Sequence, residues 1–307
     1  MAEIKTKRRK PGAHTALQVI TTELFAGIPW LVHGFSTRHG GVSEEYGGGA
    51  LNMGITPEDT RPNVERNREL FFAAIGAAGT RVKDPRHTSW PAPGMRQIHS
   101  SIIHRVREMP SQPLQGDGLI TDVPEFVLSV RVADCMPILL VDPVRRAVGA
   151  FHAGWRGTLA RIAEKGVGEF QRNFGSKPED LKAAIGPGIH RCCYEVSEDF
   201  REKFASQFSY GEDLFEAVFS SDPVRRKYPL LFMNQRAPGH GEPPRTLHLD
   251  LVEANRRQLM DSGVRPEKIW ASELCTSCSI DLLFSHRKEK GVTGRMVGAV
   301  GIRGMKN

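Results

Sequence analysis

Three residues of metal-binding or nucleophilic type stand in or beside apolar stretches of the chain. Cys135 follows Asp134 at the end of the run "SVRVADC", and His152 comes near the end of a second run, "AVGAFHA". His99 stands in "RQIHS". A catalytic zinc ion commonly takes three protein ligands of these types and keeps a fourth position open for water or substrate. We therefore treat His99, Cys135 and His152 as candidate ligands of a zinc ion. The zinc ion would lower the pKa of a bound water.

The same residues support a second chemistry. Cys135 and His152 would form a thiolate and imidazole pair for nucleophilic catalysis, and a neighbouring cation would lower the pKa of the thiol in either case. The spacing is too long for a local zinc motif, so the fold must bring the residues together. A cysteine at a strand end also often fills a core. Asp134 would orient a histidine, act as a base, or only cap the strand.

The elements that must position these residues follow from apolar periodicity. Helices are predicted over 61–77, 155–175 and 250–263, and a short strand over 95–106. Further strands are predicted over 125–135, 137–142, 147–153, 181–189 and 295–303. His152 then lies at the carboxyl end of a strand, a usual place for chemistry in α/β proteins. We expect a basic disordered tail (1–16) and one mixed α/β domain (17–307) in a three-layer-like arrangement, irregular over 205–245.

The composition of the 307-residue chain is that of an ordinary globular protein, with 39% hydrophobic and 25% charged residues. No apolar run reaches about eighteen residues, which predicts no membrane span. The basic start lacks the apolar region of a secretory signal, so we expect a cytoplasmic protein. The net charge of +7 suits anionic small substrates, but "KTKRRK" in the tail supplies five of the positive charges. Charge therefore gives no argument for nucleic-acid binding.

Eight segments, in the same order along residues 33–296, resemble the YfiH-type laccase-domain family, formerly called multicopper polyphenol oxidoreductases. They are "HGFSTRHGGVS", "LNMG", "RQIHS", "GDGLITD", "SVRVADCMPILLVDP", "AVGAFHAGWRGT", "AAIGPGIHRCCYEV" and "FSHRKEKGVTGRM". They run through most of the chain, which makes the resemblance specific.

The resemblance implies a single-domain α/β fold with zinc held by two histidines and a cysteine, here His99, Cys135 and His152, and copper as the alternative metal. It implies phosphorolysis of adenosine, inosine, guanosine and methylthioadenosine, and hydrolytic deamination of adenosine. Catalytic roles then fall on Cys135, His152 and Asp134, with purine nucleosides and phosphate as partners. We expect a monomer or small homo-oligomer with no nucleic-acid or membrane partner.

Five residues are candidate substrate contacts: Arg38, Asn52, Gln97, Arg156 and His286. Arg38, in the loop "STRHGG", suits phosphate, or it braces the loop. Arg156, at the start of a predicted helix, suits an anion, or it pairs with a carboxylate. Asn52 would bond a ribose or base, or only support a turn. His286 stands where the family commonly has tyrosine, which places it at a variable edge of the substrate pocket.

The five cysteines are an odd set, which argues against a disulfide framework. Cys275 and Cys278 have CxxC spacing without a second such pair or the pattern around a thioredoxin-like centre, and we assign them no site. Cys192 and Cys193 would face opposite sides of an extended strand, one in the core and one at the pocket. The family pattern has no counterpart of Cys278, and it usually has a cysteine where Gly188 stands.

Three other functions stay open. A copper-dependent polyphenol oxidase needs paired histidine ligands, yet no two of the eleven histidines stand at positions i and i+2. A cysteine hydrolase or amidase acting on a cell-wall precursor would use Cys135 as nucleophile and would survive chelation. A basic RNA-associated protein with a structural zinc would need an aromatic platform that 7% aromatic residues without a clustered motif do not supply.

Overall fold

The computed structural model describes residues 2–7, 16–78, 89–219 and 245–304. Internal contacts divide the chain into two compact units, one of residues 1–190 and 251–307, the other of residues 191–250. The mixed α/β class expected from the sequence is confirmed, and residues 191–250 are inserted into the chain of the larger unit. Among the described residues, no helix combines the length and apolarity needed to cross a membrane.

One sheet of the larger unit has five strands in the order β1-β2-β3-β17-β9, with antiparallel neighbours. They are β1 (Ala2–Lys7), β2 (Leu17–Thr22), β3 (Leu31–Ser36), β17 (Met296–Ile302) and β9 (Val127–Val132). The expectation of a disordered tail differs from the structure at residues 2–7, because the open edge of β2 pairs with them. The part of that tail at 8–15 lies outside the described residues.

The second sheet has six strands in the order β16-β12-β10-β11-β8-β6. They are β16 (Ile269–Ala271), β12 (Lys182–Ile185), β10 (Met136–Asp142), β11 (Ala147–Ala153), β8 (Gly118–Thr121) and β6 (Ile103–Arg105). The pairs β12·β16 and β6·β8 are parallel and the others antiparallel, so the sheet is mixed, as expected. β5 (Met95–Arg96) and β7 (Leu114–Gln115) form a separate parallel pair.

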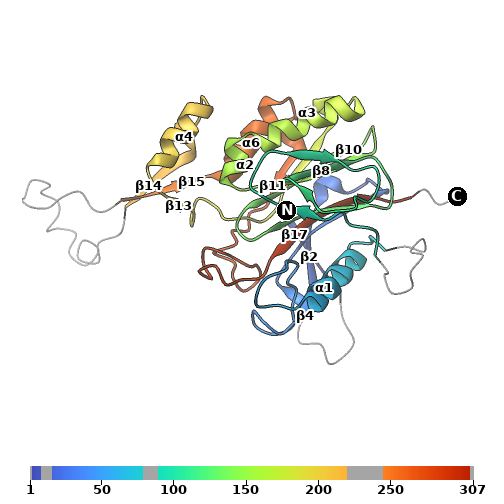
Figure 1. Cartoon of the computed structure of the whole chain (residues 1–307). Coiled ribbons are helices and arrows are strands. Elements are labelled where there is room, and N and C mark those ends of the chain that lie inside the picture. The colour runs from blue at the N-terminus through green and yellow to red at the C-terminus, as the bar shows by residue number, and fades with distance from the viewer. Residues whose placement is uncertain (1, 8–15, 79–88, 220–244, 305–307) are drawn as a thin grey trace, which may run out of the picture. The chain divides into compact units, whose positions relative to one another are not determined.

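Helices complete the larger unit: α1 (Arg61–Ala74), α2 (Trp155–Leu159), α3 (Ile162–Phe174) and α6 (Leu251–Asp261). α3 packs on α6 and β11, and α6 packs on β12, while β10 and β11 contact β17 of the other sheet (Figure 1). The two sheets and the helices form the three layers that were expected. The middle position of β10 and β11 explains why every residue in both strands is buried and why their sequences are continuously apolar.

Local sequence explains where the helices begin and end. The Thr60 hydroxyl accepts the amide of Asn63 at the start of α1, with a proline in the first turn. The single helix predicted over 155–175 is two helices, because Arg161 between them has a φ of 62°. Gly175, with a φ of 64°, ends α3. The short strand predicted over 95–106 is also divided, into β5 and β6, by a loop that carries His99.

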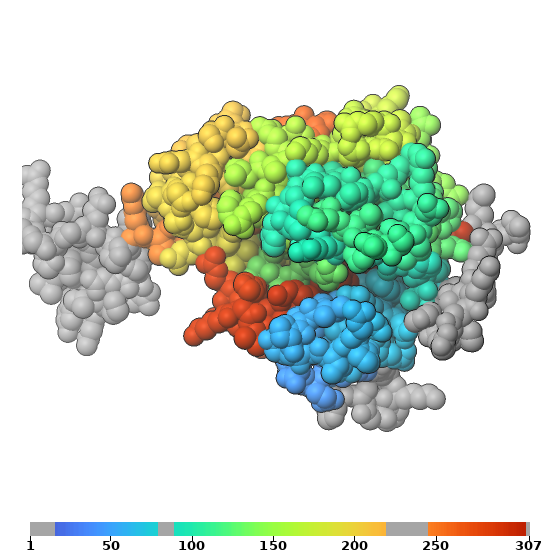
Figure 2. Space-filling view, in the orientation of Figure 1, coloured from blue at the N-terminus to red at the C-terminus, as the bar shows by residue number. Residues whose placement is uncertain are grey.

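Two segments far apart in sequence lie together in the larger unit. The amide of Arg38 donates to the carbonyl of Leu282 at 3.0 Å, and the amide of Met53 donates to the carbonyl of Arg295 at 2.8 Å. Figure 2 shows the red segment near the C-terminus beside the blue segment that follows β3. β4 (His39–Ser43) packs there against α1.

The smaller unit is built on a sheet in the order β13-β15-β14. Its elements are β13 (Glu195–Val196), α4 (Asp199–Gln207), β14 (Phe215–Phe219) and β15 (Arg245–Leu249). Phe204 of α4 is fully buried and its ring lies 5.9 Å from that of Phe215. β14 interrupts the irregular segment expected over 205–245, of which residues 220–244 lie outside the described part.

Candidate metal centre

The fold brings His99, Cys135 and His152 together. Their candidate ligand atoms lie within 4.8 Å of one another, and the two imidazole rings are 4.8 Å apart at 72°. Cys135 immediately precedes β10, and His152 lies in β11 opposite Pro137 of β10. His99 lies in the loop after β5. His152 is buried, Cys135 is partly exposed and His99 is exposed, so the centre is open to solvent on the His99 side.

Asp117, just before β8, holds both histidines in place. Its Oδ1 contacts Nδ1 of His152 at 2.8 Å and accepts the backbone amide of His99 at 3.1 Å. Its Oδ2 accepts the amides of Ile98 and Ser100 and the Ser100 hydroxyl. These bonds hold His99 in the left-handed region, at a φ of 58°. Sequence analysis gave Asp117 no role, although an acidic residue between two glycines beside a buried strand is a usable signal.

The charges of the site are strongly coupled. Burial raises the pKa of the Cys135 thiol, but the charge of His152 and hydrogen bonds from both histidines lower it to about 6. Burial lowers the pKa of His152, but the Cys135 thiolate and Asp117 raise it to about 9. Burial raises the pKa of Asp117, yet hydrogen bonds from His152 and Ser100 lower it to about 2. Near neutral pH the side chains are therefore a thiolate, an imidazolium and a carboxylate.

The residues present fit a transition metal. One thiolate and two imidazoles are a ligand set that suits zinc and also copper. Asp117 engages Nδ1 of His152, which leaves Nε2 for a metal, the arrangement common for ligand histidines. Gly154 keeps the space open, because a Cβ there would lie 2.8 Å from Sγ of Cys135 and 3.0 Å from Cδ2 of His99.

Asp134 adjoins the centre but is bonded to the C-terminal segment. Its Oδ1 accepts the hydroxyls of Thr276 and Ser285 at 2.6 and 2.7 Å, and its Oδ2 accepts the amide of Arg287 at 2.7 Å. Its backbone has a φ of 88°, a conformation that these bonds hold in place. This geometry favours a positioning role next to Cys135 over that of a base.

Two of the candidate substrate contacts are engaged inside the protein. The Arg38 guanidinium donates to the carbonyls of Ile280 and Tyr46 and pairs with Glu289. It also lies 4.7 Å over the ring of Phe284. Asn52 is fully buried, and its amide bonds the backbone of nearby residues and the carboxylate of Asp59. These arrangements favour the loop-bracing interpretation of Arg38 and the turn-supporting interpretation of Asn52.

The other three candidates lie in different settings. Gln97 donates to the carbonyl of Arg131 and accepts its amide, so it pairs with β9 as a strand neighbour would. Arg156 is exposed, with its guanidinium 4.3 Å over the ring of Trp155. His286 is exposed and directly precedes the residue whose amide binds Asp134. Arg156 and His286 are thus the two candidates that present side chains to solvent.

A surface hollow of about 680 Å³ runs along α3. Its lining comes from α3, the end of α6 and residues 101–103, and most of its side chains are charged or polar. The three candidate ligands are not among its lining residues. We therefore assign no role to this hollow.

Comparison with known proteins yields a consistent set of relatives. The sequence pattern of the family described as multi-copper polyphenol oxidoreductase laccase matches residues 32–303. The chain is 36% identical to the purine nucleoside phosphorylase of Deinococcus radiodurans, over 88% of each chain. It is 34% identical to purine nucleoside phosphorylase YlmD of Geobacillus stearothermophilus, over 91% of this chain and 92% of the relative. The crystal structure of the Bacillus licheniformis hypothetical protein YfiH is similar with a TM-score of 0.74 at 31% identity, covering 93% of this chain and 96% of that one.

Proposed function

Because the chain belongs to the multi-copper polyphenol oxidoreductase laccase family, we propose that it is a metal-dependent purine nucleoside phosphorylase centred on His99, Cys135 and His152. The observation that carries the proposal is the convergence of these ligand atoms within 4.8 Å, beside a carboxylate that fixes both histidines. Relatives that match nearly the whole chain are named purine nucleoside phosphorylases, which supports the reaction class.

We propose zinc as the metal, with copper as the alternative. Zn²⁺ on these ligands would supply a Lewis acid with a fourth position open to a substrate oxygen or to water. Asp117 would keep the proton of the neutral His152 on Nδ1, so that Nε2 carries the lone pair. Binding therefore requires His152 to lose the proton that its raised pKa of about 9 retains in the metal-free protein.

The proposed substrates are phosphate and adenosine, inosine, guanosine or methylthioadenosine. An oxygen of hydrogen phosphate forms a bond to the anomeric carbon, the bond from that carbon to the purine nitrogen breaks, and the purine leaves with the proton that the phosphate gives up. Exposed Arg156, four residues after His152, would attract the phosphate. His286 would contact the nucleoside at the edge of the site. Arg38 would act indirectly, because its donors already bind backbone carbonyls and Glu289.

The proposal includes hydrolytic deamination of adenosine at the same centre. Water adds to C6 of the adenine ring and ammonia leaves, so this reaction needs no phosphate. Residues that serve phosphate alone should therefore affect phosphorolysis and leave deamination unchanged.

The test is an assay of the purified full chain with adenosine, with and without phosphate. Chromatography should show adenine only when phosphate is present and inosine in either case. His152→Ala should abolish both products. His104→Ala is the matched control, because His104 contacts the carbonyl of Gln115 outside the centre. Product formation that His152→Ala leaves at the wild-type rate would refute the proposal.

One observation favours a second candidate, a cysteine hydrolase or amidase. Asp117, His152 and Cys135 form a chain in which the carboxylate orients the imidazole and the imidazole lowers the pKa of the thiol. This order of groups suits a nucleophilic thiolate. The two candidates differ in their response to chelation. The phosphorylase should lose activity with its metal, whereas the hydrolase should stay active and be inactivated by covalent labelling of Cys135.

A further inference from the structure

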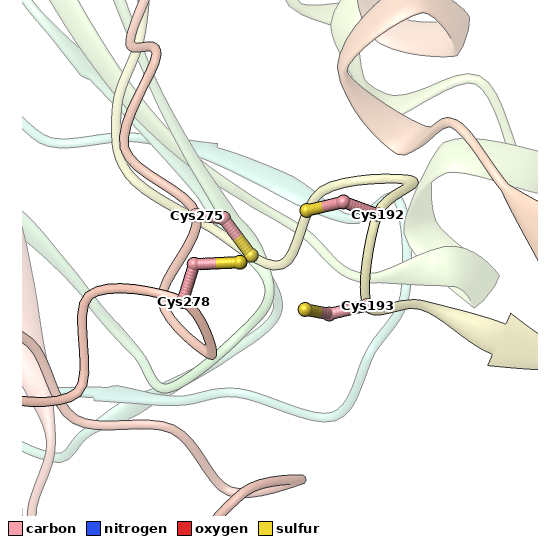
Figure 3. Close-up of side chains that lie close together, drawn as sticks. All are labelled: Cys192, Cys193, Cys275 and Cys278. Carbon is pink, nitrogen blue, oxygen red and sulfur yellow. The ribbon is translucent and has the colours of Figure 1, made fainter.

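Four cysteines outside the candidate centre come together at a single point. The sulfur atoms of Cys192, Cys193, Cys275 and Cys278 lie within 4.8 Å of one another, and Figure 3 shows them directed toward a common centre. We propose that these residues form a second metal site, in which four thiolates bind one zinc ion. The proposal does not depend on the reaction at the first centre.

Backbone contacts place the pair Cys192 and Cys193 near the pair Cys275 and Cys278. The amide of His190 donates to Sγ of Cys275 at 3.4 Å, and the amide of Thr276 donates to the carbonyl of Gly188 at 2.9 Å. These contacts lie within the larger unit. Cys192 follows His190 by two residues, so its Cα lies no more than about 7 Å from that of His190. The hydrogen bond between His190 and Cys275 therefore keeps the Cys192–Cys193 pair close to the Cys275–Cys278 pair.

The backbone at 191–193 allows two adjacent cysteines to face one ion. These residues form a turn rather than an extended strand. The expectation that Cys192 and Cys193 would point to opposite faces was therefore wrong, because the alternation of side chains holds only for extended backbone. Together with the turn at 275–278, they supply the second cysteine pair whose absence had argued against a structural zinc site.

The geometry and chemistry suit zinc. Four sulfurs at about 2.3 Å from a tetrahedral Zn²⁺ are about 3.8 Å from one another. Sulfurs already within 4.8 Å reach that spacing with small side-chain rotations. The amide bonded to Cys275 would stabilise the thiolate, as is usual around metal ligands. Four protein ligands leave no open position, so the site would be structural rather than catalytic.

Such a site would act on the first centre through Thr276. Thr276 lies within the 275–278 turn, and its hydroxyl binds Asp134, the neighbour of Cys135. The carbonyl of Asp134 also accepts the amide of Ile189 at 2.7 Å. Zinc on the four thiolates would thus fix the two segments that hold Asp134, which makes the second site a support for the position of Cys135.

The test is metal stoichiometry in the full chain, purified without chelators and supplied with zinc. We expect about two zinc ions per chain in the wild type and about one in Cys278→Ser. Ser277→Ala, in the same turn, is the matched control and should keep both ions. In the variant His99→Ala/His152→Ala, cobalt in place of zinc should give the strong thiolate bands of a tetrathiolate site.

Two results would overturn the proposal. One is a wild-type stoichiometry of one ion per chain that Cys278→Ser leaves unchanged. The other is a mass that shows a disulfide within the cluster in protein purified under reducing conditions. Loss of the first ion in His99→Ala/His152→Ala with retention of the second would separate this proposal from the proposed function.

Discussion

Replacement of Asp117 by asparagine tests whether one carboxylate organises the metal centre. Both its oxygens are occupied, Oδ1 by His152 and the amide of His99, and Oδ2 by Ile98 and Ser100. An asparagine side chain is nearly the same size, but it replaces one acceptor oxygen by an NH₂ group. Wherever that group points, it meets at least two donors. The substitution therefore removes a charge and leaves hydrogen-bond donors without an acceptor.

The magnitude follows from the pKa. Burial raises the pKa of Asp117, but hydrogen bonds from His152 and Ser100 lower it from 3.8 to about 2, which corresponds to about 2–3 kcal/mol of folding free energy at neutral pH. Because the folded-state pKa is depressed, this contribution is present above pH 4 and disappears as the pH falls toward 2. Asp117→Asn should therefore lose about 2–3 kcal/mol at pH 7. Loss of the partner of a ligand histidine should also weaken zinc binding about 10–100-fold.

The assay combines urea unfolding of metal-free protein at pH 7 with zinc titration against a competing chelator. Asp142→Asn is the matched control, because Asp142 is equally buried and lies at the far end of the β10–β11 hairpin. Its Oδ1 accepts the amides of Val144 and Arg145, which an asparagine oxygen can replace. The control should leave zinc affinity unchanged.

The reasoning fails if Asp117→Asn binds zinc within twofold of the wild type. Equal free energies of unfolding for Asp117→Asn and Asp142→Asn at pH 7 would likewise show that the depressed pKa of Asp117 does not contribute to folding stability. Asp117→Glu is a second variant for use if Asp117→Asn does not fold, because it keeps the charge and moves the oxygens. Asp117→Glu should keep most of the free energy of unfolding of the wild type, whereas its zinc affinity should fall.

Four further predictions concern the metal centre and the two arginines considered for phosphate. Gly154→Ala places a Cβ 2.8 Å from Sγ of Cys135 and should lower zinc affinity at least about tenfold in the same titration; unchanged affinity would place the metal elsewhere. In metal-free protein, iodoacetamide labelling of Cys135 should increase with pH about a midpoint near 6, the pKa to which His152 and His99 lower the thiol despite its burial, whereas a midpoint above 8 would exclude the thiolate. Arg38→Ala should lower the free energy of unfolding by about 2–3 kcal/mol with little change in the KM for phosphate. Arg156→Ala should do the opposite, with an increase of about tenfold in KM, and the reverse pattern would return the phosphate role to Arg38.

Much of the fold could be predicted because burial leaves a strong mark on sequence. β10 and β11 lie between a sheet and helices, so both read as uninterrupted apolar runs, and the residues at their ends are easily located. That is why Cys135 and His152 could be chosen as partners. The loop at His99 could not be predicted in the same way. Its left-handed backbone depends on Asp117, eighteen residues away, and no local pattern encodes such a contact.

The two aspartates show why neighbours in sequence were a poor guide to neighbours in the site. Asp134 was chosen because it adjoins Cys135, but its carboxylate binds the C-terminal segment. The carboxylate that serves His152 comes instead from the start of β8, because β8 pairs with β11 and places Asp117 beside the imidazole. A residue next to a ligand in sequence is joined to it through the backbone, but its side chain can point elsewhere. A residue on the neighbouring strand can place its side chain beside the ligand. For a ligand on a buried strand, the orienting partner is therefore better sought one strand away.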